Sequence, residues 1–442
     1  MKRVFLFMLA AVISVVSCNM VDSQNGTEQE EGQVPEQAPG PEIDFSTFEQ
    51  VPLQSKVENI QPMTGIVLWN THSMSSSSPK YLQLEYSYML YNQICKGKDV
   101  FDWTPMDNLL KQVASRGHQL VVRFRYSYVG QKCAVPDYIK KWPGYEETVG
   151  ESEGKTTYFP DWRCEELQRF HHEFHRRFAE RYDNDPRLAF VQTGFGLWAE
   201  YHIYDGPFIL GKTFPSYKFQ AEFFRKMEEY FKNTTWSISI DAADGTYSPL
   251  STQPDLLNLR FGNFDDSFMH QTHDQYNRTC WLFFGEDRYK KAPRGGEFSY
   301  YSDYDQEHCL DKNGMYGRVF EDEVAKYHMT YILGNDQPGY QSKERIKEAS
   351  MSMGYRFAVK DFRVKEDTAA VLISNVGVAP IYRKAYVAVD GVRGKYSLDR
   401  LMPQDEEWVV IQAPGLSSKS KVTIECDHLV AGQKIEFEAD IK

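Results

Sequence analysis

Short apolar runs alternate with amphipathic stretches along most of the chain. Runs rich in β-branched and aromatic residues predict strands, and apolar residues at three- and four-residue spacing predict helices. The strands are expected at residues 65–69, 81–86, 118–126, 188–195, 236–241, 256–261 and 328–333, with one more at either 280–284 or 295–299. The helices are expected at residues 105–116, 165–182, 217–231 and 320–327. This alternation is typical of the α/β class.

Eight strands over about 275 residues match a (β/α)₈ TIM-like barrel in size and count. A doubly wound open sheet is the alternative, but no glycine-rich phosphate loop follows the first strand. After Gly354 only strand-like runs remain, which predicts a small C-terminal all-β sandwich of about 90 residues. We therefore expect a barrel at 58–345 and a sandwich at 350–442.

The N-terminal segment has the pattern of an export signal. Lys2 and Arg3 precede an apolar run at 4–16 and then Ser17-Cys18, which resembles a bacterial lipobox. The run is too short for a membrane-spanning helix, which needs about 20 residues. We expect a lipoprotein signal peptide at 1–18, lipidation at Cys18, and a protein anchored to the bacterial cell envelope, on the periplasmic side or at the cell surface. A plain secreted protein with an incidental Cys18 is the alternative.

The segment that follows is acidic and poor in large apolar residues. Residues 19–50 contain eight acidic side chains and no Lys or Arg. Such a segment buries too little apolar surface to offset its chain entropy. We expect a disordered acidic tether at 19–57, which places much of the formal net charge of −12 outside the folded body.

Composition narrows the function. Hydrophobic residues make up 41% and charged residues 25%, as in ordinary globular proteins. The acidic balance argues against a nucleic-acid partner, which usually needs a basic surface. Aromatic residues are abundant at 14%, and Trp and Tyr rings stack on sugars as well as packing cores.

The polar residues that follow the predicted strands are rich in carboxylates. A barrel of this kind carries its active site at the C-terminal ends of its strands. Glycoside hydrolysis needs two carboxyl groups, one as general acid and one as nucleophile or base. Glu200 after the fourth strand and Glu297 at the seventh are the expected catalytic pair, with Glu286 as a rival for the second position. A glutamate that is only solvated or ion-paired at the rim is the alternative.

Further residues near the strand ends are expected to bind substrate. Arg123 and Arg125 share one face of their strand, so they predict an acidic ligand group or a carboxylate partner. The remaining candidates are Trp69, Tyr86, Tyr126, Trp198, His202, Asp265 and Asp266. Core packing for the rings, and turns or caps for the aspartates, are the alternatives.

Other chemistries have little support. His171 and His175 are four residues apart on a predicted helix, but there is no HExxH motif, and a half-buried helix face explains them. There is no CxxC motif and no zinc-type spacing of cysteines. No metal or organic cofactor is therefore expected. Cys133 and Cys164 would be the first pair to test for a disulfide.

Several segments resemble a set of uncharacterised bacterial barrel-plus-sandwich lipoproteins, the paired families labelled domains of unknown function 4874 and 4832. The segments are YLQLEYSYMLYNQ, FDWTPMDNLLKQVASRGHQLVVRFRYSY, FVQTGFGLWAEYH, NFDDSF, RGGEF, GYRF and NVGVAP. Such proteins tend to show Gly-x-Trp-Gly-Glu-x-His. Here Gly196, Trp198, Glu200 and His202 match and Ala199 replaces glycine.

More distantly, the two glutamates are similar to the acid/base and nucleophile of (β/α)₈-barrel glycoside hydrolases. Those enzymes commonly carry Asn before the strand-four glutamate, where this chain has Ala199. The resemblance favours a seventh strand at 295–299 and Glu297 over Glu286. It implies an exported glycan-processing protein, with a glycan or oligosaccharide as partner. A non-catalytic carbohydrate-binding lipoprotein and a structural component of a surface complex are the alternatives.

Overall fold

The structure is a computed structural model that describes residues 44–442. The expected signal peptide at 1–18, the lipidation site at Cys18 and the tether up to residue 43 lie outside the described residues. No helix among the described residues has both the length and the apolar composition that a bilayer crossing requires.

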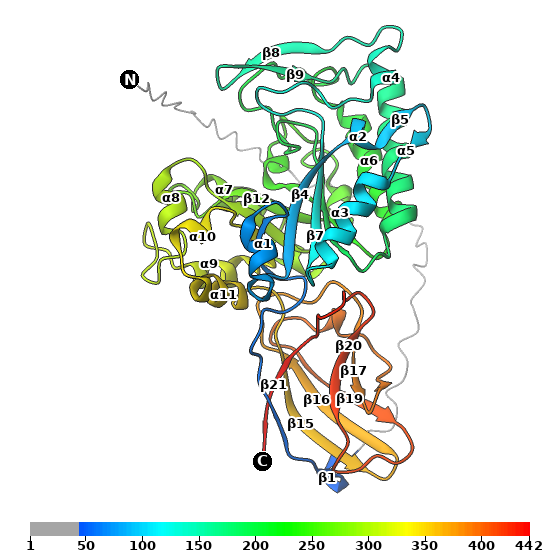
Figure 1. The fold of residues 1–442 in the computed structure, drawn as a ribbon, viewed down its shortest axis with the longest axis vertical. Helices are drawn as coiled ribbons and strands as arrows, with labels where there is room; N and C mark the ends of the chain where they lie inside the picture. The colour runs from blue at the N-terminus through cyan, green and yellow to red at the C-terminus, as the bar shows by residue number, and fades with distance from the viewer. Residues whose placement is uncertain (1–43) are drawn as a thin grey trace, which may run out of the picture. The chain divides into compact units, whose positions relative to one another are not determined.

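Eight parallel strands close into a barrel (Figure 1). In chain order they are β3 (Gly65–Trp69), β4 (Leu84–Leu90), β7 (Gln119–Arg125), β10 (Leu188–Gln192), β11 (Thr235–Ser239), β12 (Gly262–Phe268), β13 (Arg294–Phe298) and β14 (Tyr331–Leu333). β14 pairs in parallel with β3 and closes the ring. The predicted (β/α)₈ barrel is confirmed.

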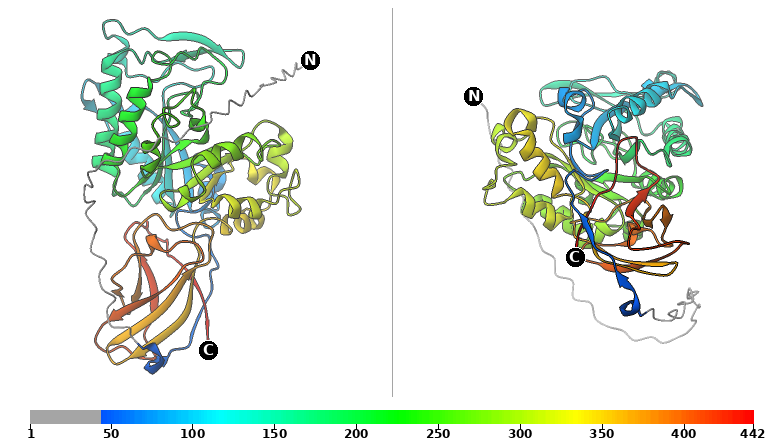
Figure 2. Two further views of the ribbon diagram at one scale, coloured as in Figure 1. Left: turned by 180° about the vertical axis from the view of Figure 1, so that it is seen from behind. Right: turned by 60° about the horizontal axis from the view of Figure 1, so that its bottom comes forward.

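Helices between the strands surround the barrel (Figure 2). They are α1 (Ser73–Ser77), α2 (Tyr91–Ile94), α3 (Thr104–Ala114), α4 (Asp137–Lys140), α5 (Glu165–Tyr182), α6 (Tyr217–Tyr230), α7 (Tyr276–Phe283), α8 (Asp303–His308), α9 (Phe320–Tyr327), α10 (Gln337–Tyr340) and α11 (Lys343–Met351). In α5, Leu167, Phe170, Phe174 and Phe178 are fully buried and form the stripe that packs on the strands. Two small hairpins, β5 (Cys95–Gly97) with β6 (Val100–Phe101) and β8 (Thr148–Ser152) with β9 (Lys155–Phe159), lie in the loops.

Strand alternation decides which side chains enter the barrel. In β7, Leu120, Val122 and Phe124 face the helices, where Phe124 packs on Phe174 of α5 at 4.8 Å between ring centroids. The intervening residues face inward, so Arg123 lies inside the barrel. A strand buried on both faces therefore carries charges on one of them.

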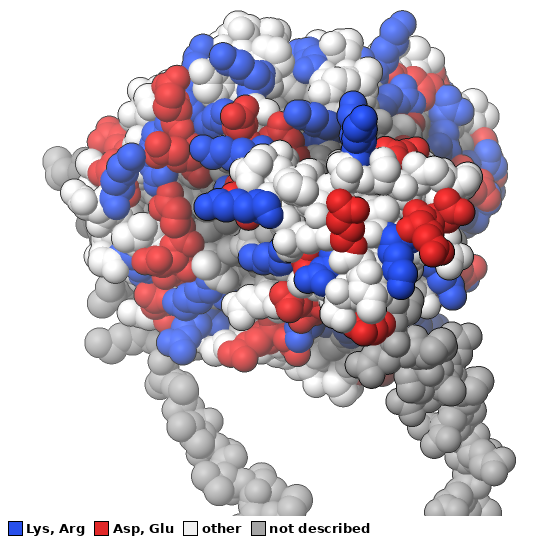
Figure 3. All heavy atoms as spheres, turned by 90° about the horizontal axis from the view of Figure 1, so that it is seen from below, with Lys and Arg blue, Asp and Glu red and all other residues white. Residues whose placement is uncertain are grey.

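The C-terminal region is all β. One six-stranded sheet contains β15 (Phe357–Lys365), β16 (Thr368–Asn375), β19 (Glu406–Gln412) and β21 (Phe437–Ile441), and a three-stranded sheet contains β17 (Ala385–Val389), β18 (Val392–Arg393) and β20 (Val422–Cys426). Their inner faces share one apolar cluster. The pairing is antiparallel except between β15 and β21. Seen from below, this end of the molecule carries cationic and anionic side chains interspersed (Figure 3).

The ordered body begins before residue 58. β1 (Glu49–Gln50) pairs with β15, and β2 (Leu53–Ser55) pairs with β21, so residues 49–55 complete the six-stranded sheet. Phe45 stacks on Trp408 at 4.4 Å between ring centroids. The expectation of a tether as far as residue 57 is therefore wrong for this stretch, because its few apolar side chains pack on a sheet that lies more than 300 residues later in the sequence.

Three element predictions need correction. The second strand covers residues 84–90 and not 81–86, because Pro79–Tyr81 forms a 3-10 turn. Residues 256–261 do not form the sixth strand; Pro254–Asn258 is another 3-10 turn, and β12 follows it. Residues 280–284 lie largely in α7, so β13 is the seventh strand, in agreement with the 295–299 alternative.

The barrel and the C-terminal sheets meet at the N-terminal ends of the strands. Arg383 donates from one guanidinium nitrogen to the Leu188 carbonyl at 2.9 Å and to the Thr234 hydroxyl at 2.7 Å. Tyr382 donates its hydroxyl to the Tyr289 carbonyl at 2.6 Å. These contacts fix the bottom of the barrel and leave the opposite end, the mouth, free of the C-terminal sheets. All six cysteines of the described residues are free thiols, Cys133 and Cys164 included.

Candidate active site

A buried hydrogen-bond network forms the floor of the mouth. The Gln192 side chain at the end of β10 accepts from the Tyr86 hydroxyl at 2.9 Å and from Arg123 Nε at 2.8 Å. Its amide nitrogen donates to the Tyr331 hydroxyl at 2.8 Å. All four side chains are at least 98% buried. Gln192 thus links strands two, three, four and eight and fixes the arginine in one orientation.

Arg123 forms an ion pair across the lumen with Asp266 of β12. Arg123 Nη1 lies 2.7 Å from one carboxylate oxygen, and Nη2 lies 3.3 Å from the other. Phe264 lies flat beneath the guanidinium carbon at 4.0 Å. Burial lowers the Arg123 pKa, but Asp266, Tyr86 and Tyr88 together outweigh this effect and raise the pKa further above its usual range. The predicted residues Arg123 and Asp266 are brought together here.

Glu297 faces the same space from β13. A Cβ added at Gly295 would lie within 2.3 Å of the Tyr331 ring, so Gly295 faces the lumen, and alternation turns Glu297 the same way. Burial raises the Glu297 pKa well above its usual value, and the negative charge of Asp266 raises it further. Arg123 acts in the opposite direction without cancelling the shift.

Glu200 lies in a tight loop after β10. The Gly196 amide donates to the Glu200 carbonyl at 2.8 Å, and a Cβ on Gly196 would lie 1.9 Å from the His202 carbonyl oxygen. Trp198 and Ala199 both have positive φ, at 53° and 57°. The loop therefore requires glycine at 196 and holds two non-glycine residues in the left-handed region, where backbone strain is stored next to the carboxylate.

Burial also raises the Glu200 pKa well above its usual value. The charges of Asp266 and Asp241 add to this effect, Arg123 opposes it, and Glu297 raises it further. The charge of Glu297 therefore affects Glu200, and the same Asp266–Arg123 pair affects both glutamates. Such groups titrate as a pair, not as independent carboxylates.

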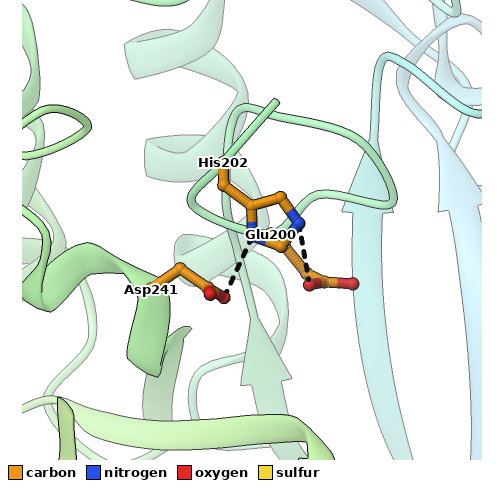
Figure 4. Close-up of side chains that lie close together, drawn as sticks. All are labelled: Glu200, His202 and Asp241. Carbon is orange, nitrogen blue, oxygen red and sulfur yellow. Dashed lines mark ion pairs between the residues drawn. The ribbon is translucent and has the colours of Figure 1, made fainter. Parts of the chain in front are cut away.

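His202 links Glu200 to Asp241, which lies in the 3-10 turn after β11 (Figure 4). Its Nδ1 lies 3.1 Å from an Asp241 oxygen, and its Nε2 lies 3.7 Å from a Glu200 oxygen. Burial opposes the imidazolium, but Asp241 outweighs it and raises the His202 pKa. Burial alone would raise the Asp241 pKa, and His202 lowers it instead.

These three side chains are close enough to be considered as metal ligands. One donor atom from each lies within 4.8 Å of the others. The two carboxylates, however, approach opposite nitrogens of one ring, so the three groups form a chain and do not converge on a single point. The His202 ring pairs with Asp241 on one side and faces Glu200 on the other, and this arrangement favours a role in orienting Glu200.

Aromatic rings follow one another along the rim. Trp69 contacts Tyr88 at 5.3 Å, Tyr88 contacts Tyr128 at 6.1 Å, and Tyr128 contacts Trp198 at 6.0 Å between ring centroids. Trp198 then stacks on Tyr204 at 5.6 Å. Of these five rings, Trp69 and Trp198 were predicted. They surround the carboxylates with flat, partly exposed faces.

Three predicted residues lie elsewhere. Tyr126 faces outward and its hydroxyl contacts His171 Nδ1 at 2.9 Å, because it is an odd number of residues from Arg123 on the strand. Asp265 also faces outward and accepts from Asn277 and Trp281 of α7 at 2.8 and 3.2 Å. Glu286, the rival of Glu297, lies beside Arg294 at the N-terminal end of β13.

The histidines of α5 are structural. His171 and His175 are at least 99% buried against Phe223, and burial lowers the His175 pKa to about 3. The nearby cavity of about 410 Å³ between α5 and α6 is lined largely by charged side chains such as Glu165, Glu222 and Lys226. It lies on the outside of the barrel and contains none of the residues that face the mouth.

Three residues of the site were not predicted from the sequence: Tyr88, Tyr128 and Gln192. Tyr88 lies two residues after Tyr86 on one strand, so a strand ending at residue 90 would have placed it on the same inward face. Gln192 ends a strand whose neighbours carry charges, and no local pattern marks it. Tyr128 follows β7 in a loop, where alternation gives no guidance.

Comparison with known proteins gives remote similarities. No family model matches the chain, and the resemblance to the two uncharacterised families stays a prediction. No curated protein matches it either. Among solved structures, an alpha-galactosidase from Thermus thermophilus bound to p-nitrophenyl alpha-D-galactopyranoside is 11% identical, with a TM-score of 0.38 over 72% of this chain and 66% of that one.

Two further structures are similar at the same level. A GH5_18 protein from Streptomyces cattleya in complex with GlcNAc is 9% identical, with a TM-score of 0.41 over 66% of this chain and 79% of that one. A glycoside hydrolase family 30 subfamily 8 xylanase from Clostridium acetobutylicum is 10% identical, with a TM-score of 0.36 over 82% of this chain and 98% of that one. The barrel is defined by its own strand pairing.

Proposed function

We propose that this protein is an exported glycoside hydrolase, with Glu200 as general acid/base and Glu297 as nucleophile or base. The observation that carries the proposal is a pair of glutamates, Glu200 buried and Glu297 half-buried, whose pKa values are both raised and are both affected by the same Asp266–Arg123 ion pair. One of them follows the fourth barrel strand and the other lies on the seventh.

The chemistry follows from the coupling. Two carboxyl groups that share a low-dielectric site lose their protons in separate steps, so the pair holds one proton over an intermediate pH range. The protonated group gives its proton to the leaving glycosidic oxygen, and the ionised one attacks the anomeric carbon or activates water. Arg123 supports the ionised member, because its charge lowers the pKa of both glutamates.

His202 and Asp241 support Glu200 as the acid/base. This role requires the carboxyl group to hold a proton first and recover one later. The ring of His202 separates Glu200 from Asp241 and fixes the direction of its carboxyl group. The Asp241 charge keeps the Glu200 pKa raised.

The rim rings support a sugar substrate. Trp69, Tyr88, Tyr128, Trp198 and Tyr204 offer apolar faces with polar edges, which suit the CH faces and hydroxyls of a glycan. Tyr300 and Tyr301 follow β13 directly and are 51% and 77% exposed. The basic and apolar N-terminal segment ending at Cys18 supports export and lipid anchoring to the cell envelope.

Turnover of a glycan library tests the proposal. The wild type is expected to release sugars from at least one glycan, and Glu200→Gln and Glu297→Gln are expected to remove that activity. Glu286→Gln is the matched control, because this glutamate lies at the other end of β13. Retention of a glycan without turnover by the wild type would indicate a carbohydrate-binding protein. Full activity in Glu200→Gln would refute the assignment.

A further inference from the structure

Arg125 is a buried cation at the mouth without an anionic partner. Its exposed fraction is only 8%, and its Nη2 donates to the Gln131 side chain at 2.8 Å. Its Nε is buried with no hydrogen-bond partner. Among the described residues no carboxylate forms an ion pair with it, although a buried charge is costly unless it is paired.

Each of the other buried arginines of the described chain donates to at least two acceptors, although Arg288, Arg294 and Arg318 also have a buried Nε without a partner. Arg123 pairs with a carboxylate, and Arg288, Arg294 and Arg383 donate to backbone carbonyls at the bottom of the barrel. The remaining two, Arg318 and Arg345, have both kinds of acceptor. In this part of the chain Arg125 is the exception, since its one protein acceptor is a neutral amide oxygen.

The position of Arg125 points to the substrate. It lies two residues after Arg123 on the inward face of β7, one step nearer the mouth. Its guanidinium carbon lies 4.4 Å from the Tyr128 ring centroid and 5.6 Å from that of Tyr88. The charges of Glu200 and Glu297 affect the Tyr88 hydroxyl. Two rings of the rim thus hold the guanidinium, and one of them, Tyr88, is also affected by the charges of the proposed catalytic pair.

We propose that Arg125 binds an anionic substituent of the substrate, so that the site takes an acidic glycan, such as one with a uronic acid carboxylate or a sulfate ester. This inference rests on the proposed glycan-binding site and names the class of substrate that enters it. A planar guanidinium held between rings presents two parallel N–H donors, which match a carboxylate or sulfate. The anion supplies the missing countercharge on binding.

The carboxylates nearby do not oppose this proposal. Asp266 is held in an ion pair with Arg123. Asp241 is likewise paired with His202. None of these carboxylates affects the Arg125 pKa, which burial lowers and the neighbouring Tyr88 and Tyr128 raise. The mouth can accept an anionic sugar on the side of β4 and β7.

The test measures binding in the Glu200→Gln background, where turnover does not intervene. Isothermal titration compares hexuronate oligosaccharides with their carboxyl-reduced forms, and sulfated oligosaccharides with their desulfated forms. At least one anionic member is expected to bind 10-fold or more tightly than its neutral counterpart. Adding Arg125→Gln is expected to remove that preference and to change neutral binding less than 2-fold. If the hexuronate oligosaccharide and its carboxyl-reduced form differ in affinity, the ligand group is a carboxylate; if the sulfated and desulfated forms differ, it is a sulfate.

Two further variants control the experiment. Lys132 is an exposed cation close in sequence to Arg125, and its amine lies over the Tyr158 ring. Lys132→Gln is expected to keep the preference for the anionic oligosaccharide. Arg125→Lys keeps the charge but loses the paired donors, so a partial, several-fold loss confined to the anionic member is expected even if Arg125→Gln folds poorly. Thermal unfolding of each variant reports folding.

The outcomes separate this inference from the proposed function. Equal binding of anionic and neutral members, or an equal loss for both in Arg125→Gln and Arg125→Lys, would overturn the role of Arg125 even if the wild type hydrolyses a neutral glycan. Arg125-dependent binding of an acidic glycan without wild-type turnover would leave this inference standing and refute the hydrolase.

Discussion

The buried charged side chains at the two ends of the barrel differ in their partners. At the bottom, Arg288, Arg294 and Arg383 donate hydrogen bonds to backbone carbonyls, and burial lowers the pKa of each arginine to about 10. At the mouth, the cation that affects both Glu200 and Glu297 is Arg123, which is already paired with Asp266. The pKa values of both glutamates are therefore raised.

The difference separates stability from function. At the bottom, the hydrogen bonds of Arg383 join the C-terminal sheets to the barrel and contribute to folding. Unsatisfied or mutually repelling groups at the mouth cost folding free energy, and such groups persist where a bound ligand or a reaction uses them. The comparison therefore predicts that substitutions at the mouth change activity, whereas substitutions at the bottom change stability.

The largest expected effect is on catalysis. Glu200→Gln and Glu297→Gln should each lower kcat by about 10³-fold or more, because each removes a proton donor or an ionised base that the reaction needs. Initial rates on the best glycan substrate measure this loss. The melting temperature should not fall, since each substitution removes a buried charge; a large drop in both variants would contradict the comparison.

The next effect is on stability at the bottom. Arg383→Met should lower the free energy of unfolding by about 3 kcal/mol, because it leaves the Leu188 carbonyl and the Thr234 hydroxyl without their buried donor. Denaturant unfolding measures the change, and activity per folded molecule should be unaltered. Arg393→Met, which removes a partly exposed ion pair with Glu425, is the control and should cost less than about 1 kcal/mol.

The raised glutamate pKa values also predict a pH dependence of stability. The folded state holds protons on Glu200 and Glu297 that the unfolded chain releases near its ordinary glutamate pKa. Their contribution is therefore fully present below that pKa and is lost as pH rises through the folded values. Each tenfold difference in proton affinity between the folded and unfolded states corresponds to about 1.4 kcal/mol of this loss. The double variant Glu200→Gln/Glu297→Gln should flatten the slope between pH 4 and 8 in chemical denaturation, and an unchanged slope would contradict it.

The smallest effect concerns the strained loop. Ala199→Gly should raise the free energy of unfolding by about 1 kcal/mol, because φ at this position is 57° and glycine adopts it without a Cβ penalty. Ala242→Gly, at a position without positive φ, should instead lower stability. A loss of stability in Ala199→Gly would remove the argument for strain beside Glu200.

The sequence predicted well the elements that bury one regular face. Helix 165–182 has the bounds of α5, and 320–327 has those of α9, because apolar residues at helical spacing alternate with charges. It failed at β12, where Asp265 and Asp266 interrupt the apolar pattern. Asp266 faces inward to Arg123 and Asp265 faces outward to Asn277, so both faces of this strand carry buried charge.

The candidate site was predictable only in part. Glu200 and Glu297 follow from barrel topology, since polar residues after parallel strands meet at one end. Tyr126 was assigned to the wrong side, although strand alternation places it on the face opposite to Arg123 and Arg125. Whether Arg123 and Arg125 find a carboxylate partner is decided by strands that are far apart in the sequence.

The sequence by itself determined the alternation of strands and helices, the all-β C-terminal region and the carboxylates after strands four and seven, because these depend on local periodicity. The tertiary structure alone decided which charges are paired, which remain unpaired and which rings surround them. Closing the barrel fixes the register of every strand at once, and that register turns each side chain toward the mouth or toward the helices.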